Sequence, residues 1–231
     1  MSVKQAIFRR VAAQFGHPTG RFGRFAGWIM GSRASNRERN RWAVSLLDIQ
    51  PSDRVLEIGF GPGLAIRELA RLAAEGYVCG IDHSEVMVRQ ASRRNAQALS
   101  SGRVHLRLGS VESLPKFDEP FDKILAVNAI QFVADPVERL ADLRALLVVG
   151  GRVAIAHQPR CPGATDETSE LSGQRIAAQL AEAGFSDVRV EMLKLKPAVV
   201  CVLGVNASGA GGLLERRAET GAGTLSARIS T

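Results

Sequence analysis

Two carboxylates and three glycines are the residues of this sequence whose spacing best suits binding of a ligand. Glu57 lies in the stretch VLEIGFGPG, two positions before three glycines at every second residue, Gly59, Gly61 and Gly63. Asp82 ends the next apolar run, YVCGID. Glycines that directly follow a buried strand let the backbone come very close to a ligand. The pattern predicts a ligand site where the first strand turns into a helix.

The spacing of these residues also favours one kind of ligand. A dinucleotide site of the form G-x-G-x-x-G would need glycine at position 64, and the residue there is Leu64. A carboxylate at Glu57 would repel a pyrophosphate but suits a cation. Asp82 stands where a carboxylate can accept hydrogen bonds from both hydroxyls of a ribose. A ligand with a ribose and a positive charge satisfies both acids, and S-adenosylmethionine is such a ligand.

Four stretches of the chain resemble, in order and spacing, a known family. They are VLEIGFGPG, GIDHSEVMVRQA, LGSVESLPKFDEPFDKILAVNAIQF and VVGGRVAIA. Over about residues 45–205 the chain resembles the class I S-adenosylmethionine-dependent methyltransferases, in particular the subgroup like the ubiquinone and menaquinone biosynthesis methyltransferases. The resemblance implies a methyltransferase that uses S-adenosylmethionine.

The resemblance also implies which residues contact the cofactor. The glycines would pass under the methionine portion, Glu57 would lie near its amino group, and Asp82 would bind the ribose. The residues at the adenine and methyl ends would complete the site. The implied set is Glu57, Gly59, Gly61, Gly63, Asp82, His83, Met87, Ser110, Val111, Asn128 and Ala129.

Some members of this set depart from the family pattern or have a second interpretation. Where the family typically has Gly-Asp-Ala, this chain has a serine at 110, and a neutral hydroxyl is a weaker acceptor than a carboxylate. We therefore expect the backbone near Val111 to hold part of the adenine. His83 takes a position that is more often apolar, and Met87 suits the core as well as the adenine. Asp82 could cap the following helix, but capping by Ser84 would leave Asp82 free for the ribose.

Methyl transfer from a sulfonium needs an aligned nucleophile and no dedicated base. If a proton must be removed, His157 at the end of a strand and His17 in the amino-terminal arm are the candidates. Each histidine could instead be an ordinary strand-end or loop residue. The nearest acid after the fourth strand, Asp135, suits a helix cap better than a metal ligand. We therefore expect no metal, and a small-molecule or lipid-like methyl acceptor.

Apolar runs alternate with helical stretches from Arg54 onward, which predicts an α/β fold with a Rossmann-like, mostly parallel seven-stranded sheet and helices on both faces. The last two strands, 185–193 and 198–205, are too close for a crossover helix and should form an antiparallel edge hairpin. The other predicted strands are 54–59, 77–82, 103–108, 121–127 and 150–157. The predicted helices are 64–75, 84–99, 135–147 and 172–184.

The chain divides into a basic helical arm or lid at 1–45, a cofactor-binding domain at 46–205 and a flexible tail at 206–231. The net charge is +7, and the first acidic residue is Glu38, so much of the excess lies in the arm. The arm could cover an apolar acceptor or meet an anionic surface. RNA methylation and a non-catalytic partner subunit are the alternatives. Three scattered cysteines fit a reducing compartment such as the cytoplasm. An oligomer is compatible with the sequence.

Overall fold

The computed structural model describes residues 34–130 and 133–207, and the apolar runs in these residues form seven strands. The strands are β1 (Arg54–Ile58), β2 (Tyr77–Asp82), β3 (Val104–Leu108), β4 (Phe121–Val127), β5 (Leu147–His157), β6 (Ser186–Leu193) and β7 (Val199–Val205).

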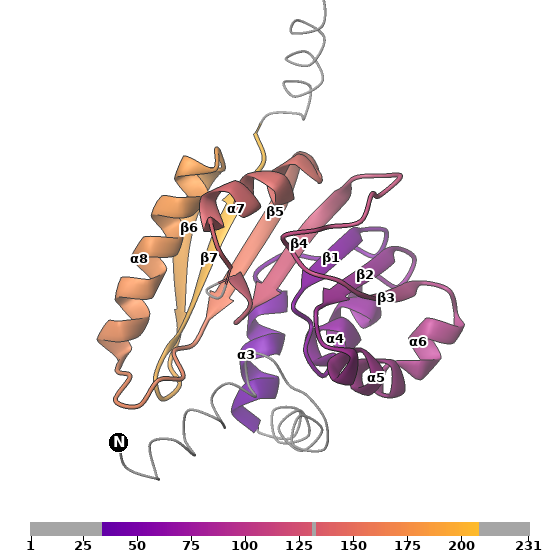
Figure 1. Cartoon of the computed structure of the whole chain (residues 1–231), viewed down its shortest axis with the longest axis horizontal. Helices are drawn as coiled ribbons and strands as arrows, with labels where there is room; N and C mark the ends of the chain where they lie inside the picture. Colours follow the sequence, from indigo (N-terminus) through magenta and orange to yellow (C-terminus); the bar gives the residue numbers. More distant parts are fainter. Residues whose placement is uncertain (1–33, 131–132, 208–231) are drawn as a thin grey trace, which may run out of the picture.

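The strands form one sheet in the order β3-β2-β1-β4-β5-β7-β6 (Figure 1). β1 to β5 pair in parallel, whereas β7 is antiparallel to both β5 and β6. This confirms the predicted mostly parallel sheet with an antiparallel edge hairpin. The chain leaves β1 towards β2 and returns on its other side as β4, so the switch point lies between β1 and β4. In open α/β sheets, ligands bind at the carboxyl ends of the strands at such a point.

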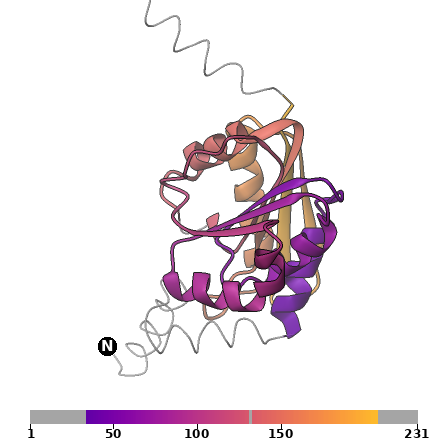
Figure 2. The ribbon, with the colours of Figure 1, turned by 90° about the vertical axis from the view of Figure 1, so that its right-hand side faces the viewer.

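Six helices in the described residues cover the two faces of the sheet. They are α3 (Ala34–Ser45), α4 (Leu64–Leu72), α5 (Glu85–Arg94), α6 (Ala96–Ser100), α7 (Pro136–Ala145) and α8 (Asp166–Glu182). Buried residues of α3, α4 and α5 share one core cluster, and those of α7 and α8 share the other. Figure 2 shows the indigo α3 and the orange α8 on opposite sides of the strands. None of the described helices is both long and apolar enough to cross a membrane.

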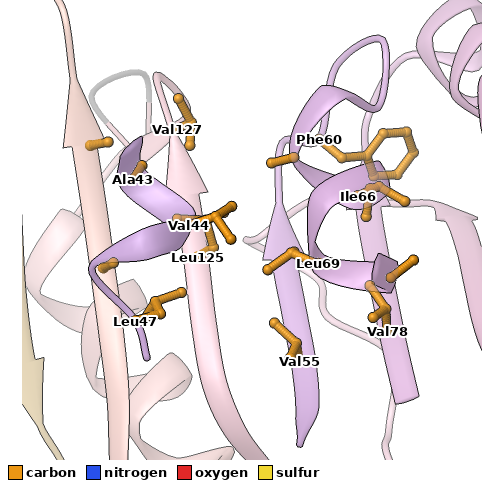
Figure 3. Packing of buried hydrophobic residues seen from close by; sticks show 14 of the residues in the cluster. Ala43, Val44, Leu47, Val55, Phe60, Ile66, Leu69, Val78, Leu125 and Val127 are labelled. Carbon is orange, nitrogen blue, oxygen red and sulfur yellow. The ribbon is translucent and has the colours of Figure 1, made fainter. Parts of the chain in front are cut away.

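The helix α3 is the part of the predicted arm that the structure describes, and it is packed into the domain. Ala43, Val44 and Leu47 are fully buried. They face Leu125 and Val127 of β4 (Figure 3). Full burial of such side chains contributes about 1.5–3 kcal/mol each for valine or leucine. The carboxyl-terminal end of the predicted arm is thus packed against one face of the sheet, near the carboxyl ends of β4 and β5.

Two element boundaries differ from the sequence-based expectation because of local hydrogen bonds. The helix α8 begins six residues before the predicted position 172, since the Thr165 hydroxyl accepts from the Thr168 amide and the Thr168 hydroxyl accepts from the Thr165 amide. Such a capping box satisfies two amide groups at a helix start. The predicted helix 84–99 is divided at Asn95, whose side-chain amide donates to the carbonyl oxygens of Gly63 and Ala91.

The strand β5 also starts earlier than predicted, at Leu147 instead of position 150. Leu147 pairs with Phe121 at the start of β4, ahead of a register irregularity between Phe121 and Lys123. At the far end of the domain, Asn206 is buried and its side-chain amide donates to the carbonyl of Leu147 at 3.0 Å. The first residue of the predicted tail is therefore anchored, and positions 208–231 lie outside the described residues.

Candidate functional site

The loop between β1 and α4 carries the three glycines, and each has a left-handed backbone conformation, with φ of 68° at Gly59, 52° at Gly61 and 76° at Gly63. A β-carbon at Gly59 would lie 2.5 Å from that of Ala129, and one at Gly63 would lie 2.7 Å from that of Ala91. At Gly61 it would meet nothing within 4 Å. Gly59 and Gly63 thus allow close packing of protein on protein, while Gly61 faces space that a ligand can use.

Asp82, at the end of β2, connects this loop to the neighbouring one. Its carboxylate accepts a hydrogen bond from the Gly61 amide at 2.7 Å through Oδ2 and from the Ser84 amide at 2.9 Å through Oδ1. Of the two capping alternatives, the structure places Ser84 at the start of α5, but Asp82 is not left without hydrogen bonds. Ser84 occupies the N-cap position without a side-chain cap bond. Burial raises the pKa of Asp82, and the two amides act in the opposite direction.

Glu57 is the second carboxylate of the site, and it is only 1% exposed. Its Oε2 has no hydrogen-bond partner. Burial and the nearby charge of Asp82 raise the pKa of Glu57 to about 8, although the amide of Ile66 in the first turn of α4 opposes the shift. A buried polar atom without a partner costs free energy. An ammonium group next to Glu57 would remove that cost, so the residues present fit the amino group of S-adenosylmethionine.

The residues predicted for the adenine end lie around the carboxyl ends of β2 and β3. The Gly109 amide donates to the Asp82 carbonyl at 3.0 Å, which joins the two strand ends. Ser110 Oγ accepts from the Glu112 amide at 3.3 Å, which leaves its O–H and a second lone pair for a ligand. Val111 is buried in the core cluster of α7 and α8.

His83 and Met87 differ in their surroundings although both belong to the predicted set. The His83 side chain is exposed, with Nδ1 4.0 Å from the carboxylate of Asp82. Met87 is buried in the core cluster that α3, α4 and α5 share. The position of His83 allows contact with a ligand on Asp82, whereas Met87 is packed among apolar side chains.

Asn128 and Ala129 continue β4 directly beside the glycine loop. Ala129 lies against Gly59 across the switch point. Asn128 has a left-handed conformation with φ of 54°, and its Oδ1 accepts from the Gln158 amide at 2.8 Å. Its backbone amide donates to Ala156 at 2.8 Å. The structure therefore brings the β4 residues of the predicted set next to the glycines, on the side towards β5.

His157 lies at the end of β5, and its Nδ1 is 2.5 Å from the hydroxyl of Ser172 in α8. Burial, followed by the positive charges of Arg175 and Arg39, lowers the pKa of His157 to about 4. The imidazole is therefore neutral at pH 7 and is a weak base there. His17, the other predicted base, lies outside the described residues.

A polar cluster next to His157, with Asn36, Arg39 and Gln158 buried and Arg160 exposed, is absent from the sequence-based prediction. Nη1 of Arg39 donates to Gln158 Oε1 at 2.9 Å. Nη2 of Arg160 donates to the same oxygen at 3.2 Å and to Asn36 Oδ1 at 2.6 Å. The sequence did contain a signal, since Asn36, Arg39 and Asn40 share the helical stripe of the apolar residues at 43, 44 and 47. Polar residues on an apolar stripe are unusual unless they have partners.

A hollow of about 570 Å³ lies beside α3, away from the two carboxylates. Arg37, Arg41 and Trp42 are among the residues that line it. It is open, with no strand end or glycine loop in its lining, and we assign the ligand site by the unpartnered Glu57 oxygen and the open space at Gly61. Among the described residues, no group of three or more His, Cys, Asp or Glu side chains is arranged to hold a metal ion.

Comparison with known proteins gives consistent matches. A family model described as "Methyltransferase domain" matches residues 55–151. Uncharacterized methyltransferase YdaC of Bacillus subtilis is 33% identical over 172 residues, which cover 74% of this chain and 92% of that protein. The ubiquinone/menaquinone biosynthesis C-methyltransferase UbiE of Geotalea daltonii is 31% identical over 121 residues. That match covers 52% of this chain and 52% of the relative, so the chain matches about half the length of that protein.

Solved structures give the same result for the fold. A SAM dependent methyltransferase from Aquifex aeolicus superposes with a TM-score of 0.58 at 20% identity, over 71% of this chain and 88% of that one. At this identity the likeness concerns the arrangement of helices and strands alone.

Proposed function

This chain belongs to the class I S-adenosylmethionine-dependent methyltransferases, and we propose that it methylates a small-molecule or lipid-like acceptor without a metal ion. S-adenosylmethionine is its cofactor. The observation that carries the placement of the cofactor is the position of two buried carboxylates, Glu57 and Asp82, around the open glycine at 61.

The carboxylates would divide the polar groups of the cofactor between them. Glu57 would accept from the ammonium group, directly or through water, and the buried oxygen without a partner supports this role. Asp82 would accept from the ribose hydroxyls, in place of or beside the amides of Gly61 and Ser84. Ser110 and the backbone at Val111 would contact the adenine, with His83 and Met87 at its edge.

S-adenosylmethionine supplies an electrophilic methyl group on a sulfonium centre. The chain's own contribution would be to hold the acceptor in line with that group and to exclude water. Asn128 and Ala129 would line the methyl end, because they follow β4 and Ala129 contacts the glycine loop. The residues that follow β4 support metal independence. The first acid after β4 is Asp135, which lies at the N-cap position of α7 and suits a helix cap better than a metal ligand. His157 would orient the acceptor by hydrogen bonding.

The acceptor class rests on the resemblance to quinone-type methyltransferases and on the aromatic and apolar residues of the amino-terminal arm, which would act as a lid. UbiE of Geotalea daltonii is named for ubiquinone and menaquinone biosynthesis, and the match to it supports a quinone-like or phenolic acceptor. The same basic arm could hold the protein at an anionic surface. A cytoplasmic location would suit the three free cysteine thiols. A nucleic-acid substrate and an oligomer have no support beyond the basic charge and the exposed edge of β6.

Calorimetric titration with S-adenosylmethionine and S-adenosylhomocysteine tests the cofactor site. Asp82→Asn should weaken both by ten- to a hundredfold, because it loses charge-assisted hydrogen bonds worth about 1.5–3 kcal/mol. Asp53→Asn is the matched control. Asp53 is also a buried carboxylate that accepts a backbone amide, from Gln50 at 2.8 Å, but it lies at the opposite end of β1.

Three results would contradict the proposal. Absence of binding to either compound would favour a non-catalytic partner subunit, and equal affinity in Asp82→Asn would remove Asp82 from the site. With binding established, the acceptor class is tested by transfer of a labelled methyl group to phenols, quinols and lipids. The same assays with a metal chelator test metal independence. Transfer only to RNA would overturn it.

A further inference from the structure

Arg39 is a buried cation whose hydrogen bonding is incomplete. Its side chain is in the middle of α3, and the residue is 7% exposed. One terminal nitrogen donates to Gln158, but the buried Nε has no partner. Burial and the neighbouring charge of Arg160 lower the pKa of Arg39 to about 9. A buried guanidinium with an unpaired N–H is costly, and an anion that accepts from it would offset that cost.

The described residues provide no carboxylate for this arginine. None of the ion pairs in this part of the protein includes Arg39. Asp166, the first residue of α8, already accepts from the Ala198 amide at 2.7 Å. Residues 1–33 contain no Asp or Glu, and residues 208–231 contain only Glu215 and Glu219. The natural counter-ion of Arg39 is therefore best sought outside the folded domain.

The cluster is directly connected to the expected methyl end of the site. Gln158 accepts from both arginines through its side chain, and its backbone amide donates to Asn128 at 2.8 Å. Its side-chain amide donates to the Pro197 carbonyl at 2.7 Å, which fixes the orientation of the group. One residue thus separates the arginine pair from the loop that follows β4 at the switch point.

We propose that Arg39 and Arg160, held in place by Gln158 and Asn36, bind an anionic oxygen group of the methyl acceptor, a carboxylate or a phosphate. The inference rests on the proposed function, because it places the acceptor at the ends of β4 and β5. Arginine is suited to this role since its planar group donates several hydrogen bonds to oxyanions. The anion would complete the hydrogen bonding of Arg39 and anchor the acceptor beside the methyl group.

His157 provides an independent readout of anion binding at this place. The positive charge of Arg39 contributes to the lowered pKa of this imidazole, together with burial and Arg175. An anion on Arg39 would offset that charge, so the pKa of His157 should rise when the anion binds. The change can be followed by nuclear magnetic resonance without any methyl transfer.

The proposal can be tested by titration of the full chain. The protein is first saturated with S-adenosylhomocysteine and is then titrated with benzoate, with inorganic phosphate or with neutral benzamide. We expect benzoate or phosphate, but not benzamide, to shift the Nε resonance of Arg39 and raise the pKa of His157. Arg39→Gln and, separately, Arg160→Gln should weaken anion binding about ten- to a hundredfold. Arg41→Gln, an exposed arginine two positions along the same helix, should not.

The probes identify the source of the anionic group. Preference for benzoate supports a carboxylate acceptor, and preference for phosphate supports a phosphate ester. Equal binding of benzamide, no binding of either anion, or unchanged affinity in both Arg39→Gln and Arg160→Gln would overturn the proposal. Binding of S-adenosylhomocysteine, measured on the same samples, separates this outcome from failure of the proposed function. The double variant Glu215→Gln, Glu219→Gln should leave anion binding unchanged. A gain in its affinity for the anion would instead mean that the tail occupies the arginine pair.

Discussion

The carboxylate of Asp82 holds the glycine loop against the neighbouring strand end, with 2.7 Å between its Oδ2 and the backbone nitrogen of Gly61. The residue expected to bind the ribose therefore also fixes the position of the loop that the ligand approaches. The two functions are linked, since movement of the loop would move the carboxylate's own hydrogen-bond donor. Substitutions in the loop should accordingly be judged by both stability and affinity.

Gly61→Ala should weaken cofactor binding more than it destabilises the fold. The new methyl group meets no protein atom within 4 Å, so the cost to unfolding free energy is that of a left-handed alanine, roughly 1–2 kcal/mol. Gly102→Ala is a matched control, because Gly102 also has positive φ and open space but lies in the turn before β3. Chemical denaturation should give similar losses for both variants, while calorimetry should show weaker binding only for Gly61→Ala. Equal affinity in the two would place the cofactor elsewhere.

Gly59→Ala should destabilise the protein through a direct clash, and Ala129→Gly should relieve part of it. The added β-carbon would lie 2.5 Å from that of Ala129, which is closer than two such atoms can approach. We expect a loss of roughly 2–4 kcal/mol for Gly59→Ala, from the clash and the left-handed backbone together. A double-mutant cycle by denaturation measures the coupling. Strict additivity of the two substitutions would show that the loop and the β4 end are not in contact.

Much of the fold could be predicted because its apolar runs and glycines are local signals. The strand β2 was predicted with its observed bounds, and the hairpin of β6 and β7 followed from the short connection between them. The start of α8 was missed because the capping box of Thr165 and Thr168 is a side-chain arrangement that the apolar pattern does not reveal.

The site was only partly predictable, for a related reason. The glycines and carboxylates occur in order along the chain, so the family resemblance finds them. The interaction of Arg39 with Gln158 joins residues 119 positions apart. No local pattern predicts such a pair. Only the topology brings the two residues together, because it packs α3 near the carboxyl ends of β4 and β5.

The imidazole of His157 should titrate near pH 4 in the free protein. Burial, Arg175 and Arg39 lower its pKa to about 4 from 6.5, so the folded state binds this proton less readily than the unfolded state. The group's contribution to stability is present above pH 6.5 and is lost as pH falls towards 4. His157→Gln should reduce this loss, whereas His105→Gln, at an exposed histidine of β3, should not. A resonance midpoint at the ordinary histidine pKa would contradict the buried environment.

Binding of S-adenosylmethionine should release a proton from Glu57. With its pKa raised to about 8, the free protein carries this proton in about nine of ten molecules at pH 7. The ammonium group of the ligand favours the carboxylate, so the proton leaves when the ligand binds. Calorimetry in two buffers of different ionisation enthalpy measures the release, which should approach one proton per complex and disappear in Glu57→Gln.

The same group makes the stability of the free protein depend on pH, with a sign opposite to that of an ion-paired acid. Because the folded pKa of Glu57 lies above the unfolded value of 4.5, its contribution is fully present below pH 4.5 and is lost as pH rises towards 8. The loss amounts to roughly 2–5 kcal/mol across that window. Glu57→Gln, which resembles the protonated acid, should flatten this dependence, while Glu75→Gln at an exposed position should leave it unchanged. If Glu57→Gln instead lowered stability at pH 8, the carboxylate would have to be ionised and partnered in the free protein, and the vacant hydrogen-bonding position assigned to the cofactor's ammonium group would already be filled.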